Sequence, residues 1–170
     1  MTFARLGLID PLLAALATLE YKTPTPVQVQ ALPAILAGRD LMAAAQTGTG
    51  KTAGFTLPIL QLLATAGAPV ASNSLRALVL VPTRELAEQV SESIRAYGQN
   101  LPLRTCAVYG GGRSRDLIYS IIHLISRVVA TSLEAAVYAE VERRYGRLDV
   151  LVNNAGIGAA PNDGYDKFYE

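Results

Sequence analysis

The chain has 170 residues, of which 51% are hydrophobic and 17% charged, with a formal net charge of +1. This composition is too apolar for a disordered chain, and no uninterrupted apolar run reaches the roughly 20 residues that span a bilayer, so we expect one soluble domain and no membrane contact. The near-neutral balance does not indicate a polyanion partner, so that any RNA contact has to come from a local site.

The first predicted element is a helix near the N-terminus. Arg5 and the apolar residues after it are similar to a secretory signal peptide, but Asp10 and Pro11 interrupt the apolar run and no small-residue cleavage site follows. We therefore predict a helix that is capped by Asp10 and has Pro11 in its first turn.

Strand and helix patterns then alternate along the chain. Apolar runs bounded by turn residues predict strands at 40–46, 77–83, 105–111, 127–132 and 148–154. Helical spacing of apolar residues predicts helices at 51–66, 84–100, 115–125 and 132–146. This alternation predicts a single three-layer α/β domain with a parallel sheet, and the Gly- and Pro-rich stretch at 156–170 reads as a tail.

A glycine-rich turn, "AQTGTGKT" at residues 45–52, follows the first predicted strand and opens a helix. Glycines such as Gly48 and Gly50 let backbone N–H groups turn toward phosphates, Lys51 supplies an ammonium, and Thr52 offers a hydroxyl to Mg²⁺. The pattern predicts a phosphate-binding loop for ATP or ADP with Mg²⁺.

Three further stretches stand in a fixed order around this loop: "YKTPTPVQ" at 21–28, "PTRELAEQ" at 82–89, and the glycine pair at 110–111. Together with Ala45 at the first position of the loop, they make residues 1–112 resemble the N-terminal RecA-like domain of DEAD-box RNA helicases. The resemblance implies that Gln28 hydrogen-bonds the adenine edge and that Phe3 and Tyr21 pack near the base. The remaining residues implied in nucleotide binding are Gln46, Thr47, Gly48, Thr49, Gly50, Lys51 and Thr52, and those implied in RNA contact are Pro82, Thr83, Arg84 and Gly111.

Beyond Gly112 the helicase pattern stops, because the sequence has neither Asp-Glu-Ala-Asp nor Ser-Ala-Thr. Residues 128–160, with "RLDVLVNNAGIG", resemble instead the middle of a short-chain dehydrogenase/reductase, a Rossmann-like fold. In that family the motif matched here by Asn153, Asn154, Ala155 and Gly156 stabilises the sheet beside the dinucleotide. The cofactor-loop glycines and the YxxxK motif of that family are missing, so NAD(P) binding is not expected.

The two resemblances predict a chimera in one domain: a helicase segment at 1–112, a junction at 113–127, a dehydrogenase-like segment at 128–160, and a tail at 161–170. The sequence does not distinguish a natural joining from an engineered one. An incomplete sheet would leave an open edge, from which we expect some self-association.

The expected function is adenine-nucleotide binding with impaired hydrolysis, weak or no RNA binding, and no unwinding. If "LDVLVNNAG" occupies the place of the family's acidic strand, Asn154 falls near its Asp and Ala155 near its Glu, so no catalytic residue is assigned, and Mg²⁺ is assigned only to Thr52 together with the nucleotide. Two alternatives stay open: a structural chimera without selected activity, and a weak NAD(P)-binding module. Cys106 is expected to be a core residue and His123 a core or boundary residue, and the single cysteine favours the cytoplasm.

Overall fold

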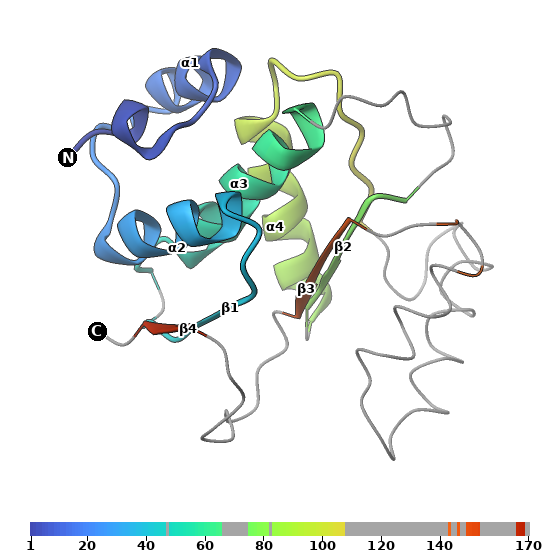
Figure 1. Cartoon of the computed structure of the whole chain (residues 1–170). Helices are drawn as coiled ribbons and strands as arrows, with labels where there is room; N and C mark the ends of the chain where they lie inside the picture. The colour runs from blue at the N-terminus through green and yellow to red at the C-terminus, as the bar shows by residue number, and fades with distance from the viewer. Residues whose placement is uncertain are drawn as a thin grey trace. The chain divides into compact units, whose positions relative to one another are not determined.

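The computed structural model describes residues 1–46, 48–65, 75–81, 83–107, 143, 146, 149–153 and 166–168. These fall into two compact units, a first unit from the ranges 1–67, 90–105 and 158–170, and a second unit from the ranges 68–89 and 106–157. Helices and parallel strand pairs make up both, which confirms the α/β class (Figure 1). Among the described residues no helix has the length and apolar character required to cross a membrane.

The first unit begins with a short 3-10 helix, η1 at Phe3–Leu6, and continues into α1 at Asp10–Thr18. Leu12, Ala15 and Leu16 are buried because residues three and four apart share one helix face. Pro11 lies in the first turn as predicted, but the predicted cap is wrong: Ile9 takes the capping position, and the Asp10 side chain does not cap. Asp10 still places a carboxylate in the first turn, where the helix dipole favours negative charge.

The end of α1 is closed by a left-handed residue that is not glycine. The Tyr21 N–H donates to the Leu16 carbonyl and the Glu20 N–H donates to the Ala17 carbonyl, at 2.9 and 3.1 Å. This pair of bonds is the Schellman pattern, in which the residue after the cap adopts a positive φ. Here that residue is Glu20, with φ of 61°. The turn therefore fixes the direction in which Tyr21 leaves the helix.

Two helices frame the glycine-rich loop: α2 at Pro26–Leu36 and α3 at Lys51–Thr65. The apolar core of the first unit consists of side chains from η1, α1, α2, α3 and the end of α4, namely Phe3, Leu6, Leu8, Leu12, Leu16, Leu32, Ala53, Leu57, Leu60 and Tyr97. Gln61 on α3 joins the N-terminal segment to this core, since its Oε1 accepts from the Ile9 N–H at 2.9 Å and its Nε2 donates to the Gly7 carbonyl at 2.6 Å.

Helix α4 spans Arg84–Tyr97 and is amphipathic. Thr83 precedes it, and the Thr83 hydroxyl accepts a hydrogen bond from the Leu86 N–H at 3.2 Å, as an N-cap does. Val90 and Tyr97 are buried on its apolar face. Residues 84–89 of this helix belong to the second unit, and residues 90–97 belong to the first.

The strands form two parallel pairs. In the first unit β1 at Leu41–Ala43 pairs with β4 at Asp166–Phe168, with Met42 opposite Lys167. The prediction of a tail at 156–170 is therefore wrong for these three residues, because the hydrogen-bonding groups of β1 give them a partner that sequence pattern does not reveal. A single sheet for the whole chain stays a prediction.

In the second unit β2 at Ala77–Leu80 pairs with β3 at Val150–Asn153, with Leu80 opposite Asn153. Both strands were predicted from their apolar runs. An ion pair marks the start of the ladder: Arg76 Nε lies 2.7 Å from Asp149 Oδ2, and the Asp149 N–H donates to the Arg76 carbonyl at 2.8 Å. The stretch "VLVN", from the segment expected to be dehydrogenase-like, thus pairs with "ALVL", and its origin stays a prediction.

Two further predictions need correction. Residues 105–107, the described part of the strand expected at 105–111, have no regular secondary structure. Cys106 is exposed and not a core residue, since without a strand there is no buried face for its side chain to join. The strand at 127–132, the helix at 115–125 and His123 lie outside the described residues.

The left-handed Glu20 generates a stability prediction. Replacing Glu20 with glycine removes the steric cost of a Cβ at positive φ but adds backbone freedom to the unfolded chain, and the first effect is larger. We expect Glu20→Gly to raise the free energy of unfolding by about 0.5–1 kcal/mol in urea titration. Glu20→Ala, which keeps the Cβ and loses only the charge, should change it little, and a Glu20→Gly protein less stable than the Ala variant would contradict the assignment.

Candidate nucleotide-binding site

The glycine-rich loop is shaped by two left-handed glycines before α3. Gly48 and Gly50 have φ of 85° and 89°, which side chains with a Cβ rarely adopt. Between them the Thr49 hydroxyl donates to the Gln46 carbonyl at 2.8 Å and pins the turn. The described part of the loop therefore wraps toward the start of α3, whose first N–H groups have no partner within the helix. Thr47 lies outside the described residues.

Lys51 is the first residue of α3, and its side chain turns back along the loop. Its Nζ donates to the Ala45 carbonyl at the beginning of the loop. The Lys51 side chain thus reaches back across the loop to its first residue, Ala45. Positive charge, glycine turns and a helix N-terminus occur together here, and each favours an anion.

Thr52 follows in the first turn of α3 and is half-buried. Its carbonyl accepts from the Thr56 hydroxyl at 2.6 Å, so the backbone at Thr52 is held inside the helix. A hydroxyl at this position is the group through which a phosphate-binding loop reaches Mg²⁺. Among the described residues there is no cluster of three or more His, Cys, Asp or Glu side chains that could hold a metal ion.

Gln28 on α2 is buried, with 1% of its surface exposed, and both ends of its amide are bonded. Oε1 accepts from the Thr25 N–H and Nε2 donates to the Gly50 carbonyl, each at 3.0 Å. The side chain therefore connects the first turn of α2 to the phosphate loop, a link between residues 22 positions apart. The predicted contact with adenine requires the amide to give up one of these bonds, and that contact stays a prediction.

The aromatic residues expected near the base form a cluster with a third ring. The Phe3 and Tyr21 ring centroids lie 6.5 Å apart, and the Tyr21 and Tyr97 rings meet edge to face at 5.9 Å. Phe3 and Tyr97 are buried, whereas Tyr21 is 42% exposed. Of the three rings, Tyr21 alone has a substantial surface open to a ligand, and Phe3 serves as its support.

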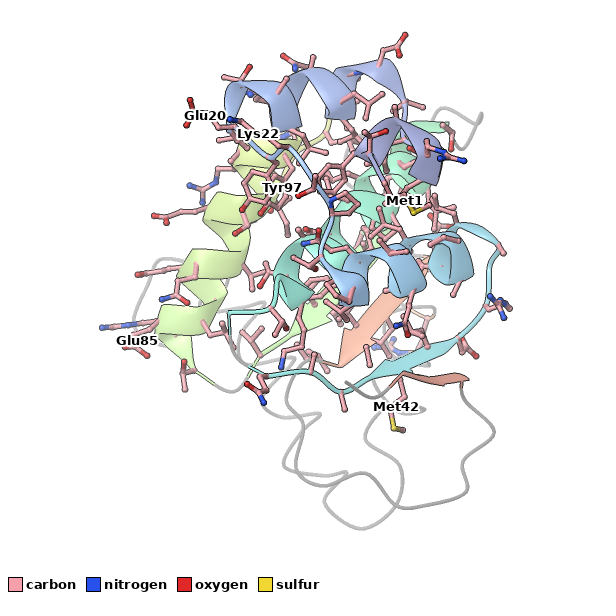
Figure 2. The ribbon with its side chains drawn as sticks, turned by 90° about the vertical axis from the view of Figure 1, so that its left-hand side faces the viewer. Met1, Glu20, Lys22, Met42, Glu85 and Tyr97 are labelled. Atoms are coloured by element: carbon pink, nitrogen blue, oxygen red, sulfur yellow. The ribbon has the colours of Figure 1, made fainter. Side chains whose placement is uncertain are left out.

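The hydroxyl groups of Tyr21 and Tyr97 lie 3.2 Å apart and share a hydrogen bond. Burial raises the pKa of Tyr97 well above its usual range, and the hydrogen bond to Tyr21 raises that pKa further. Tyr97 thus stays protonated at neutral pH and can share a proton with the Tyr21 hydroxyl. Figure 2 labels Tyr97 beneath α1, close to the segment that carries Glu20 and Lys22.

The residues expected to contact RNA are described in part. Thr83 and Arg84 are exposed at the start of α4, and Arg84 Nε lies 3.9 Å from Glu85 Oε1, a solvated ion pair that contributes little. An exposed hydroxyl and guanidinium at a helix N-terminus are suited to a phosphate backbone. Pro82 and Gly111 lie outside the described residues.

The dehydrogenase-like motif begins where β3 ends. Asn153 is the last residue of β3, and its backbone pairs with that of Leu80. Asn154, Ala155 and Gly156 lie outside the described residues. The structure therefore places the strand and leaves the roles of the four motif residues as predictions.

Sequence reasoning missed two features of this site. The bond from Gln28 to Thr25 was readable, because Thr-x-x-Gln at a helix start is a capping signature. Tyr97 gave no signal, since it ends an ordinary amphipathic pattern and meets Tyr21 across 76 positions of sequence.

Comparison with known families identifies the chain. The model of the DEAD/DEAH box helicase family matches residues 25–153. The chain belongs to this family. The match begins at Thr25, includes the glycine-rich loop and Gln28, and reaches Asn153 at the end of β3.

Curated relatives agree with this membership. An ATP-dependent rRNA helicase rrp3 from Aspergillus niger is 47% identical over 110 residues, 65% of this chain and 22% of that protein. DEAD-box ATP-dependent RNA helicase 41 from Arabidopsis thaliana is 40% identical over 134 residues, 77% of this chain and 26% of that protein. The chain thus spans about a quarter of the length of the curated relatives it matches.

Solved structures show the same fold. A DEAD box protein from Methanococcus jannaschii superimposes with a TM-score of 0.66 and 24% identity, covering 93% of this chain and 51% of that one. The RNA helicase Prp28 from Chaetomium thermophilum, solved bound to ADP, gives a TM-score of 0.65 with 24% identity, covering 92% of this chain and 46% of that one. The DEAD/DEAH chain described here is therefore RecA-like in fold.

The contact between Gln28 and Gly50 generates a prediction with a matched control. A Cβ at Gly50 would collide with Gln28 Nε2, whereas a Cβ at Gly48 would meet nothing within 4 Å, although both glycines have positive φ. We expect Gly48→Ala to cost about 1–2 kcal/mol from backbone strain, and Gly50→Ala about 1–3 kcal/mol more because the Gln28 amide loses its partner. Urea denaturation of both variants measures the difference, and equal losses would show that the Gln28 contact contributes nothing.

Proposed function

We propose that this chain binds adenine nucleotide with Mg²⁺ through residues 45–52 and hydrolyses it at close to the background rate. The observation that carries the proposal is the convergence of three anion- and nucleotide-binding features on one loop: the left-handed glycines, the Lys51 ammonium, and the buried Gln28 amide bonded to Gly50. Family membership supports the same ligand, because the rrp3 relatives are described as ATP-dependent helicases.

The phosphate chain is the part of the ligand that the described residues explain best. Lys51 has to exchange the Ala45 carbonyl for phosphate oxygens, and this exchange is favourable because an ammonium gains more from an anion than from a neutral carbonyl. The helix dipole of α3 adds to the attraction, since its positive end lies at the loop.

Mg²⁺ fits this site as part of the nucleotide complex. The ion takes six oxygen ligands and usually keeps several waters, with one or two protein groups and the substrate phosphates completing the shell. The Thr52 hydroxyl, in the first turn of α3, is the protein group that would hold it. When bound, the ion neutralises phosphate charge, and Thr52 and Lys51 orient the phosphate groups of the nucleotide.

The base is proposed to lie against Tyr21 and within reach of Gln28. The amide of Gln28 both donates and accepts, so it matches the adenine edge, which presents an amino donor beside a ring acceptor. When Gln28 pairs with adenine, it has to give up its bond to Gly50 or its bond to Thr25. Binding of the base would thereby change how Gln28 holds the glycine-rich loop.

Hydrolysis is proposed to be impaired because of the residues that follow β3. If β3 takes the place of the family's acidic strand, Asn154 falls near the position of its Asp and Ala155 near that of its Glu. Asn has no charge to hold Mg²⁺ through water, and Ala cannot orient an attacking water. The loss of a general base alone lowers rates by about 10²–10⁴-fold.

The origin of that strand is proposed to be a dehydrogenase-like segment joined to a helicase segment. The support is the sequence of residues 148–156, "LDVLVNNAG", together with the parallel pairing of β3 with β2. Parallel α/β folds share this unit, so a strand from one family can occupy a sheet position of another. RNA binding through Thr83 and Arg84 is proposed to be weak, since of the two only Arg84 carries a charge that neutralises phosphate.

Calorimetric titration tests the nucleotide site. We expect ADP and ATP with Mg²⁺ to bind the wild-type protein with one site, and Lys51→Ala to abolish the binding because the phosphates lose the Lys51 ammonium. Arg5→Ala, which removes a cation from η1, should bind as the wild type does. A folded wild-type protein that binds neither nucleotide would overturn the proposal and favour a structural chimera.

A phosphate-release assay tests the turnover. We expect the rate with ATP and Mg²⁺ to be within about tenfold of that of Lys51→Ala, with or without RNA, because the chain lacks the acidic pair whose general base is worth about 10²–10⁴. A rate that depends on Lys51 and rises with RNA would contradict impaired hydrolysis while leaving nucleotide binding intact.

A further inference from the structure

The ring of Tyr21 is held by two residues, of which one belongs to no recognised motif. Phe3 touches it from one side, with ring centroids 6.5 Å apart, and Tyr97 meets it edge to face at 5.9 Å. Tyr97 lies at the end of α4, outside the residues assigned to nucleotide or RNA. Its contact with Tyr21 therefore calls for a physical account of its own.

Tyr97 is a fixed anchor. It is 6% exposed and belongs to the apolar core together with Leu16, Leu57 and Leu60. A tyrosine packed on all sides in this way keeps one rotamer, because other positions of the ring would collide with the core. Its hydroxyl needs a hydrogen-bond partner at this depth, and the Tyr21 hydroxyl at 3.2 Å supplies one.

Tyr21 by itself would be mobile. It is 42% exposed, so solvent allows its ring several staggered rotamers. The closing turn of α1 fixes its backbone through the bond to the Leu16 carbonyl, but a backbone bond does not fix the ring. The hydroxyl bond to Tyr97 ties down the far end of the side chain, so that the ring is held at both ends.

We propose that Tyr97 is a positioning residue for the nucleotide base: through its hydroxyl it holds the Tyr21 ring in the orientation that receives the base. The inference rests on the proposed function, since it presupposes that the nucleotide binds with its base at Tyr21. Its physical basis is preorganisation, because a side chain that is already ordered loses less entropy when a ligand covers it. Tyr97 touches no ligand itself.

The effect of Tyr97 is specific to the base. The phosphate loop is held by Gln28, Thr49 and Lys51, none of which contacts Tyr97 in the bonds described above. A ligand with phosphates and no base should therefore be insensitive to the Tyr97 hydroxyl. A general loss of structure would instead weaken ligands of both kinds.

The experiment compares ADP with inorganic pyrophosphate, each with Mg²⁺, by calorimetric titration. The proteins are the wild type, Tyr97→Phe, Tyr21→Phe and the double variant. Phenylalanine keeps the ring and its packing and removes only the hydroxyl. We expect each single variant to weaken ADP binding by about two- to tenfold, the range for one hydrogen bond, with pyrophosphate binding unchanged. The double variant should be no weaker than Tyr97→Phe alone, because both single variants remove the bond between Tyr21 and Tyr97 and Tyr97→Phe additionally removes a hydrogen bond with Ser93.

Three results would overturn the inference. ADP affinity unchanged in Tyr97→Phe would show that the hydroxyl bond does not position the ring, while wild-type binding of ADP would leave the proposed function standing. Equal losses for ADP and pyrophosphate would assign Tyr97 a structural role only. No binding of either ligand to the folded wild-type protein, checked by thermal unfolding, would overturn the proposed function and this inference together.

Discussion

The buried amide of Gln28 is the constraint on which the site depends. A polar group with 1% exposure is tolerated only if its donors and acceptors are satisfied, and Gln28 meets this condition through Thr25 at the start of α2 and Gly50 in the loop. Gly50 has to be glycine for two reasons at once, its positive φ and the Gln28 side chain against it. One hydrogen-bonded side chain thus fixes where α2 begins and how the loop turns into α3.

The core of the first unit supports the two ends of the proposed ligand separately. Leu57 and Leu60 anchor α3 in the core, and the first turn of α3 contains Lys51 and Thr52. Tyr97 belongs to the same core, and its hydroxyl is hydrogen-bonded to that of Tyr21. In the proposed complex, phosphate and base are therefore recognised by groups that share a packed interior but no direct bond. Such an arrangement allows the affinity for each part of the ligand to change independently.

At strand β3, the fold depends on the main chain and the proposed chemistry depends on side chains. A parallel ladder is made of main-chain bonds, so the pairing of "VLVN" with "ALVL" does not depend on particular polar side chains. The proposed loss of hydrolysis rests instead on the residues that follow the strand in sequence, Asn154 and Ala155. The proposal is therefore that the fold is kept while the groups for hydrolysis are absent.

The sequence by itself determined the α/β class, the glycine-rich turn at 45–52, the strands within 77–83 and 148–154, and the family, because each of these depends on contiguous residues with a local periodicity or motif. Only the tertiary structure decided that Ile9 and not Asp10 precedes α1, that Cys106 is exposed, that Asp166–Phe168 pairs with β1, and that Tyr97 holds Tyr21. These features depend on contacts between residues far apart in the chain. A contact across 76 positions leaves no trace in the pattern around either residue, since its energy comes from packing and not from local propensity.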